Sequence, residues 1–351
     1  MEQKIIKKRN NSIDIFRLFC AVLVIIIHTN PFKGVNGLEF ITHQILPRVA
    51  VPFFFVVSGF FYSKTLQKEK KIFSKYLIKI LITYICWSAF YFLINMFQFI
   101  VEGTFDFIPF VKSCILGFVL TGSYYHFWFF PALIFSILIV AIFYKLKGLK
   151  VLYIVGIGLY CIGCLGCSYY DIALKIPLLS ILIQNPWFET IRRILLMGLP
   201  FFLLGALLND FRNQWTNMKF RTQWTVLIEL IVLFVLEIVV VAVTKIYDNI
   251  TLTLCLYPLV GWLFIILFNN PAEKLTKIGK ISRSCAELTY YIHPALILFA
   301  NWCIVSIFNI ICPAWLLFII VTCISLGIGL LWRKLDIKEK IMKISNRRKE
   351  K

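Results

Sequence analysis

The sequence predicts an all-α fold, a polytopic membrane helical bundle of about ten transmembrane helices with both termini cytoplasmic. Its 351 residues are 60% hydrophobic and only 15% charged, with a mean hydropathy of +0.84. Apolar runs of about 20 residues, the length that crosses a bilayer core, recur along the chain. No stretch between them is long enough to form a soluble domain, so we expect one bundle.

The distribution of charge sets the expected topology. There are 37 Lys and Arg residues against 17 Asp and Glu, a formal net charge of +20. The basic residues gather in segments that alternate with basic-poor segments, as the positive-inside rule requires for successive loops. This alternation attributes the charge to membrane orientation and argues against a nucleic-acid partner. An even number of spans then places both basic ends on the cytoplasmic side of the cell membrane, where the tail could lie at the anionic inner leaflet or, as we favour, form a solvated face.

The expected spans follow one another with short connections. Bounded by polar residues, they cover residues 13–30, 46–63, 76–100, 127–144, 149–168, 191–208, 224–244, 250–268, 285–308 and 312–332. The chain then divides into a basic cytoplasmic N-terminus (1–12), the transmembrane bundle (13–333) and a basic cytoplasmic tail (334–351). The 11 cysteines are scattered without a paired framework, so we expect no structural disulfides.

The first span carries ionisable side chains on one narrow stripe. At about 100° per residue, Arg17 lies about 60° from Asp14, and His28 lies about 20° from Arg17. Ionisable groups inside a membrane are costly and normally face a bundle interior or a wet cavity. The stripe therefore indicates a functional passage, although Asp14 and Arg17 could equally form an ion pair and His28 could merely cap the helix.

His28 and Arg48 form the strongest candidate pair. Fewer than about 20 residues join the helix that ends at His28 to the one that opens at Arg48, so the two ends must lie close together. A neutral imidazole can accept a hydroxyl proton, and a guanidinium can hold an anion or a developing oxyanion. The alternative is that Arg48 extends to the outer headgroups.

Other polar residues open or interrupt later spans. His126 and Trp128 lie in an aromatic run that could line a site or form an interfacial belt. Arg192 and Arg193 start the sixth span, where they could bind an anionic acceptor or anchor the helix. His293 precedes a proline, which frees a carbonyl one turn back, so its ring could act in chemistry or satisfy that carbonyl.

The sequence lacks several common catalytic motifs. It contains no Walker loop, Rossmann fingerprint, zinc-protease helix or nucleophile elbow, so we expect neither covalent serine catalysis nor a metal site. Glu237 lies well inside the seventh span, where helix-to-helix hydrogen bonding is favoured over a proton or cation site. Ser58-Gly59-Phe60 and the Gly198 to Gly205 stretch are typical of closely packed helices.

The motifs, taken together, resemble the acyltransferase type 3 family of integral membrane proteins. The matching segments occur in the family's order at Ile13-Asp14-Ile15-Phe16-Arg17, His28, Arg48 to Phe60, Tyr125 to Leu133, Pro200 to Ala206 and Tyr290 to Pro294. The resemblance covers residues 12–333. It departs from the family at Ile15, where a glycine often follows the aspartate.

The resemblance implies an O-acyltransferase. Such a protein moves an acyl group, often acetyl, from cytoplasmic acyl-CoA to a hydroxyl of an envelope polysaccharide or lipid-linked sugar, with no bound cofactor. It implies that His28 and Arg48 are essential, and that Asp14 and Arg17 lie on the donor side. The Arg48 segment also resembles the membrane half of the vancomycin-resistance serine racemases. This leaves a second hypothesis, a transporter of a small solute such as L-serine that uses Glu237 or Glu287.

Overall fold

Helices make up almost all of the chain that the structure describes. The computed structural model describes residues 10–66, 72–101, 103 and 106–335, and these residues contain no β-strand. They form two compact units, residues 1–50 with 267–351 and residues 51–266, and each unit is described by itself. The basic N-terminus up to residue 9 and the tail from residue 336 lie outside the described residues.

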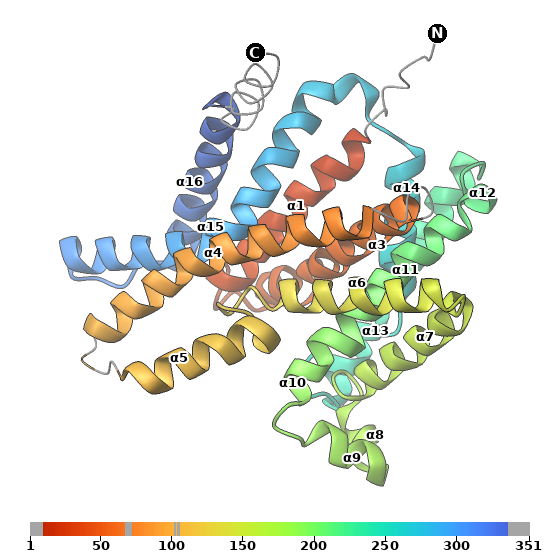
Figure 1. Ribbon diagram of the computed structural model, residues 1–351, viewed down its shortest axis with the longest axis horizontal. Coiled ribbons are helices and arrows are strands. Elements are labelled where there is room, and N and C mark those ends of the chain that lie inside the picture. The colour runs from red at the N-terminus through yellow and green to blue at the C-terminus, as the bar shows by residue number, and fades with distance from the viewer. Residues whose placement is uncertain (1–9, 67–71, 102, 104–105, 336–351) are drawn as a thin grey trace. The chain divides into compact units, whose positions relative to one another are not determined.

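The first unit combines both ends of the chain. Its described elements are α1 (Asn11–Thr29), α2 (Asn36–Glu39), η1 (Phe40–Ile45), η2 (Leu46–Val49), η5 (Glu273–Leu275), α15 (Thr276–Phe308) and α16 (Ala314–Leu335). The three long helices α1, α15 and α16 pack side by side (Figure 1). An apolar cluster of Ile25, Ala300, Cys312, Leu317 and Val321 joins them.

Hydrogen bonds fix the start of α1. The Asn10 side chain caps the helix by accepting from the Ile13 N–H at 3.2 Å, and its amide donates to the carbonyls of Leu267 and Phe268. The Ser12 hydroxyl donates to the Asn270 carbonyl at 2.6 Å and accepts from the Ala272 N–H at 2.9 Å. The polar residues ahead of the first apolar run therefore anchor α1 to the segment that leads into α15.

The second unit contains the helices between these ends. They are α3 (Ala50–Leu66), α4 (Ile72–Val101), α5 (Phe107–Leu116), η3 (Gly117–Thr121), α6 (Phe129–Lys145), α7 (Leu149–Leu165), α8 (Tyr170–Leu174), α9 (Pro177–Ile183), α10 (Phe188–Ile191), η4 (Arg192–Gly198), α11 (Leu199–Asp210), α12 (Arg212–Trp215), α13 (Phe220–Thr244) and α14 (Leu256–Asn269). Helices α6, α7 and α11 pack together with the π-helix η4, which continues directly into α11.

The helices confirm the predicted multi-pass membrane fold. In the part of the chain that the structure describes, seven helices are long and apolar enough to cross a membrane, and four apolar helices are shorter. Each predicted span has its helix. The sequence did not predict the short helix Phe107–Thr121, because a span was expected to need about 20 residues. The cytoplasmic position of the termini and the domain boundaries stay predictions.

Two glycines allow α3 and α11 to pack backbone against backbone. A Cβ atom added at Gly59 would overlap the Phe202 carbonyl, and one added at Gly205 would overlap the Val56 carbonyl and lie 2.7 Å from the Phe60 nitrogen. Small residues are the usual means of close helix approach in membranes, where the lipid supplies no hydrophobic force between helices. The predicted close packing at these positions is confirmed.

Glu237 fastens a loop. One carboxylate oxygen accepts from the Tyr169 hydroxyl and the Leu254 N–H, both at 2.6 Å, and the other accepts from the Cys255 N–H at 2.7 Å. Burial, and then the Glu237 carboxylate, raises the pKa of Tyr169, so the phenol stays protonated and donates. The carboxylate thus caps the segment that opens α14, and its partners lie in turns rather than on a second helix, where the favoured helix-to-helix hydrogen bonding would place them.

We expect Gly205→Ala to destabilise the second unit. The added methyl group meets backbone atoms of α3, which cannot rotate away, so the loss should reach about 1–3 kcal/mol or more. Gly158→Ala on α7 is the control, because a Cβ at Gly158 has no neighbour within 4 Å and alanine favours helix. Thermal unfolding of the detergent-solubilised protein measures both, and equal melting temperatures would contradict the packing argument.

Glu237→Leu should destabilise the protein by about 2–4 kcal/mol, because two backbone N–H groups and one phenol lose their acceptor. The matched control is Glu229→Leu, an exposed glutamate on the same helix, for which we expect little change. The measurement is chemical unfolding in detergent. A stability loss no larger at Glu237 than at Glu229 would rule out this capping role.

Candidate active site

The first unit brings three of the chain's 4 histidines to one end of α1. His28 lies in the last turn of α1 and is exposed. The helix ends one residue later, at Thr29, because Asn30 adopts a left-handed conformation (φ 44°, ψ 62°) and its N–H bonds to the Ile26 carbonyl. The chain turns away at once, which leaves the His28 ring at the helix end.

The His28 ring stacks on His293 of α15. The ring centroids are 5.3 Å apart and the planes meet at 26°. His293 is fully buried, and its Nδ1 lies 3.0 Å from the Thr289 carbonyl and 2.9 Å from the Tyr290 carbonyl. A carbonyl only accepts, so Nδ1 carries the hydrogen. Pro294 has no N–H to give the Tyr290 carbonyl, so the Nδ1–H of His293 supplies a hydrogen bond to that carbonyl. The same ring also contacts His28.

His43, which the sequence analysis passed over, belongs to the same cluster. It lies on the π-helix η1, and its ring hydrogen-bonds to the backbone of Ile27, the residue before His28. The Gln44 amide nitrogen lies 3.3 Å from the His43 Nδ1. Because π-helices are frequent at functional sites, the conformation of this segment favours the histidine cluster as the candidate active site.

Arg48 is oriented by the same glutamine. Its Nε donates to the Gln44 backbone carbonyl at 3.1 Å, and its Nη2 donates to the Gln44 side-chain oxygen. That oxygen faces the guanidinium, so the amide nitrogen is left to donate to His43. Gln44 therefore couples Arg48 to His43. Arg48 is half-buried on η2, which packs against α1, as expected from the short connection between the first two spans.

Asp14 and Arg17 lie near the opposite end of α1. The Arg17 guanidinium is 3.8 Å from the Asp14 carboxylate and 3.5 Å from Glu287 on α15. Eleven residues separate Arg17 from His28, which is about 17 Å of helix rise. The predicted stripe is real, but the structure does not bring its two ends into one cluster. The ion-pair interpretation holds for Arg17, with a second carboxylate that the sequence analysis did not pair with it.

The remaining predicted residues lie in the second unit. His126 is buried among aromatic rings, with its centroid 3.9 Å from Phe127 and 5.2 Å from Tyr91. The Arg193 guanidinium lies over the Trp128 ring, 5.5 Å from its centroid. Such a cation–π contact holds the arginine against the start of α6.

Arg192 and Arg193 share one carboxylate. Arg192 is buried and binds Glu189 through two nitrogens, at 2.6 and 2.9 Å, while the Arg193 Nε lies 2.7 Å from the same side chain. These pairs span three and four residues along one helical segment, so they stabilise it locally. The Glu189 carboxylate therefore offsets part of the positive charge of the two arginines.

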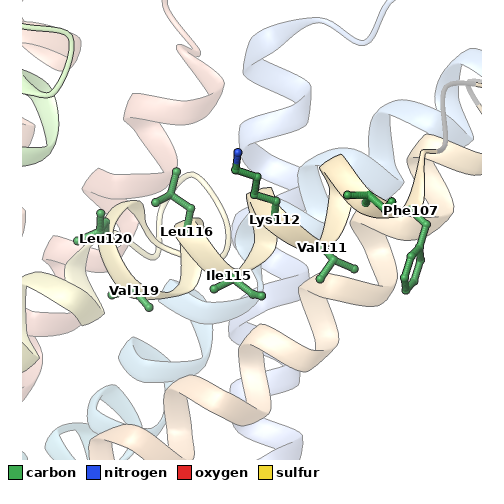
Figure 2. A pocket seen from close by; sticks show the side chains of 8 residues that line it. Phe107, Val111, Lys112, Ile115, Leu116, Val119 and Leu120 are labelled. Atoms are coloured by element: carbon green, nitrogen blue, oxygen red, sulfur yellow. The ribbon is translucent and has the colours of Figure 1, made fainter.

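A hollow of a different kind from the histidine cluster, largely apolar, lies along α5 and η3. It is lined by Phe107, Ile108, Val111, Lys112, Ile115, Leu116, Val119 and Leu120, of which Lys112 alone is charged (Figure 2). Such a largely apolar surface suits lipid chains. Among the described residues, no group of three His, Cys, Asp or Glu side chains could hold a metal ion.

Curated relatives share part of the chain. It is 34% identical over 181 residues to an amino-acid racemase of Enterococcus faecalis, covering 50% of this chain and 25% of the racemase. A second amino-acid racemase of Enterococcus faecalis is 29% identical over 214 residues, covering 60% and 29%. A serine/alanine racemase of Enterococcus gallinarum is 29% identical over 179 residues, covering 48% and 25%.

The chain thus spans between 25% and 29% of the length of these relatives. No solved structure matches it significantly. The family model described as "Acyltransferase domain" matches residues 10–332, from the cap of α1 to the last turns of α16. The match extends over nearly all the described residues, and the protein therefore belongs to the acyltransferase type 3 family of integral membrane proteins.

Proposed function

We propose that the protein is an O-acyltransferase of the cell membrane that transfers an acetyl group from acetyl-CoA to a hydroxyl of an envelope polysaccharide or a lipid-linked sugar. The observation that carries the proposal is the cluster at the end of α1. There an exposed His28 lies against a buried His293, and Arg48 is held by Gln44. Family membership supports acyl transfer in general.

His28 is the general base in this mechanism. Its exposed ring removes the proton from the acceptor hydroxyl, and the oxygen attacks the thioester carbonyl. The carbon–sulfur bond then breaks and coenzyme A leaves as the thiol, taking up the proton. His293 keeps its Nδ1 hydrogen on backbone carbonyls, so it holds one ring orientation against His28 rather than exchanging that proton.

Arg48 stabilises the negative charge that develops on the acyl carbonyl oxygen. A guanidinium positioned before reaction does this without a reorganisation cost. The two hydrogen bonds to Gln44 fix the plane of the group, and the same residue orients His43. Base and oxyanion stabiliser are in this way held by neighbouring backbone segments.

The donor approaches from the cytoplasmic side. The positive field of the basic inner loops attracts the phosphates of acyl-CoA. Asp14 and Arg17, at the start of α1, lie on this donor side. There Arg17 pairs with two carboxylates, which hold its guanidinium in place. His126, Trp128, Arg192 and Arg193, all in the second unit, stay candidates for substrate binding, and an aromatic ring such as that of Trp128 can stack on the apolar face of a sugar.

A transporter of a small amino acid is the second candidate, favoured by the similarity to proteins named amino-acid and serine/alanine racemases. The acids that it would use are engaged, since Glu237 accepts from two backbone N–H groups and Glu287 pairs with Arg17. Uptake of labelled serine by vesicles without acetyl-CoA supports transport, whereas acceptor-dependent release of coenzyme A supports the enzyme.

We expect His28→Ala to lower acceptor-dependent transfer of labelled acetyl from acetyl-CoA by about 10²–10⁴-fold, the usual contribution of a general base. Lys33→Ala, an exposed position in the loop after α1, should leave the rate unchanged. The assay uses the purified full-length protein with membrane-derived acceptor. Undiminished transfer by the His28 variant ends this mechanism.

Gln44→Leu should reduce the turnover number by about tenfold to 100-fold, because misplacement of a catalytic group by about 1 Å has such an effect. Gln44→Glu keeps the acceptor for Arg48 but not the donor to His43, so comparing the two variants separates the contributions of the two contacts. If Gln44→Leu retains the wild-type turnover number, Gln44 has no positioning role.

A further inference from the structure

We propose that the turn between α6 and α7 forms a binding pocket for a phosphate-bearing ligand. Its hollow encloses about 740 Å³, and the residues that line it are Leu66, Ala141, Tyr144, Lys145, Lys147, Leu149, Lys150 and Asp210. This volume lies within the range of about 300–1,000 Å³ typical of small-molecule sites. Phosphate recognition itself is independent of the proposed function; only coenzyme A as the phosphate source rests on it.

The turn places three lysines around one hollow. Helix α6 ends at Lys145, Lys147 takes a left-handed conformation with φ 58°, and α7 begins at Leu149. The Gly148 N–H closes the turn on the Phe143 carbonyl at 2.9 Å. The chain thus reverses within three residues, and Lys145, Lys147 and Lys150 all contribute to the same wall.

The lining of the pocket carries a net positive charge, with three lysines and one acidic residue. Its one acidic residue, Asp210 at the end of α11, already accepts a hydrogen bond of 2.6 Å from the Tyr153 hydroxyl. Three ammonium groups around one hollow repel one another, and a multivalent anion relieves that repulsion. A phosphate fits this requirement better than a single carboxylate, because it carries more charge and three acceptor oxygens.

The rest of the lining suits the organic part of a phosphate ester. Leu66, Ala141 and Leu149 supply an apolar wall and Tyr144 supplies a ring. The lysines lie in one of the basic-rich segments that the positive-inside rule assigns to the cytoplasm, where basic pockets between membrane helices bind phosphate headgroups. Both coenzyme A and an anionic phospholipid present such a phosphate on this side.

The test uses the full-length protein in neutral detergent and in nanodiscs. The pocket variant is K145Q/K147Q/K150Q, and the matched control is K274Q/K277Q/K280Q, which removes the same charge from three exposed lysines of the first unit. One arm measures coenzyme A binding by calorimetry, and the other measures retention of phosphatidylglycerol by native mass spectrometry.

The pocket variant should lose affinity for at least one probe by about tenfold or more, and the control by no more than about twofold. The affected probe identifies the source of the phosphate. The proposal is overturned if wild type binds neither probe, if neither probe is weakened, or if both variants weaken binding equally. The experiment measures binding, whereas the His28 variant tests acetyl transfer. The pocket proposal and the proposed function can therefore fail independently of each other.

Discussion

The packing of α1 along α15 determines what the ionisable side chains of α1 contact. Three contacts mark it: Asn11 against Gly279, Arg17 with Glu287, and His28 on His293. The residue numbers rise together, so the two helices run parallel. This is the relation expected of a first and a ninth span that both leave the same side of a membrane. If the contact slipped by one turn, Arg17 would lose Glu287 and the two imidazoles would separate.

The sequence predicted the helices well, because a bilayer imposes a long apolar run on each span. It also predicted that the segment carrying Arg48 lies near α1, since the connection is short, and η2 does pack against α1. The sequence did not predict that His28 stacks on His293. Both residues were candidates, but a set of separate spans does not show which helices are neighbours. Helix pairing depends on packing surfaces, and the small residues that mark these surfaces do not name their partners.

The residues near the arginines that the sequence patterns did not reveal were missed for a physical reason. His43 and Gln44 fall in a segment that periodicity assigns to a loop, because helix α2 has only four residues and η1 is a π-helix. A signal was present, since Gln44 stands four residues before Arg48, a spacing that places both side chains on one helical face. Glu189 has the same relation to Arg192 and Arg193. Attention to a polar neighbour one turn away from each arginine would have found both.

Pro294 has a consequence for the hydrogen on the His293 ring. With no amide to satisfy the Tyr290 oxygen, the backbone recruits the imidazole one position earlier, and one ring nitrogen becomes part of the architecture of α15. The hydrogen of the neutral ring therefore lies on Nδ1 and not on Nε2. A proline in the helix thereby determines which of the two nitrogens of the preceding histidine carries the hydrogen, so the tautomer of that ring is set by the backbone.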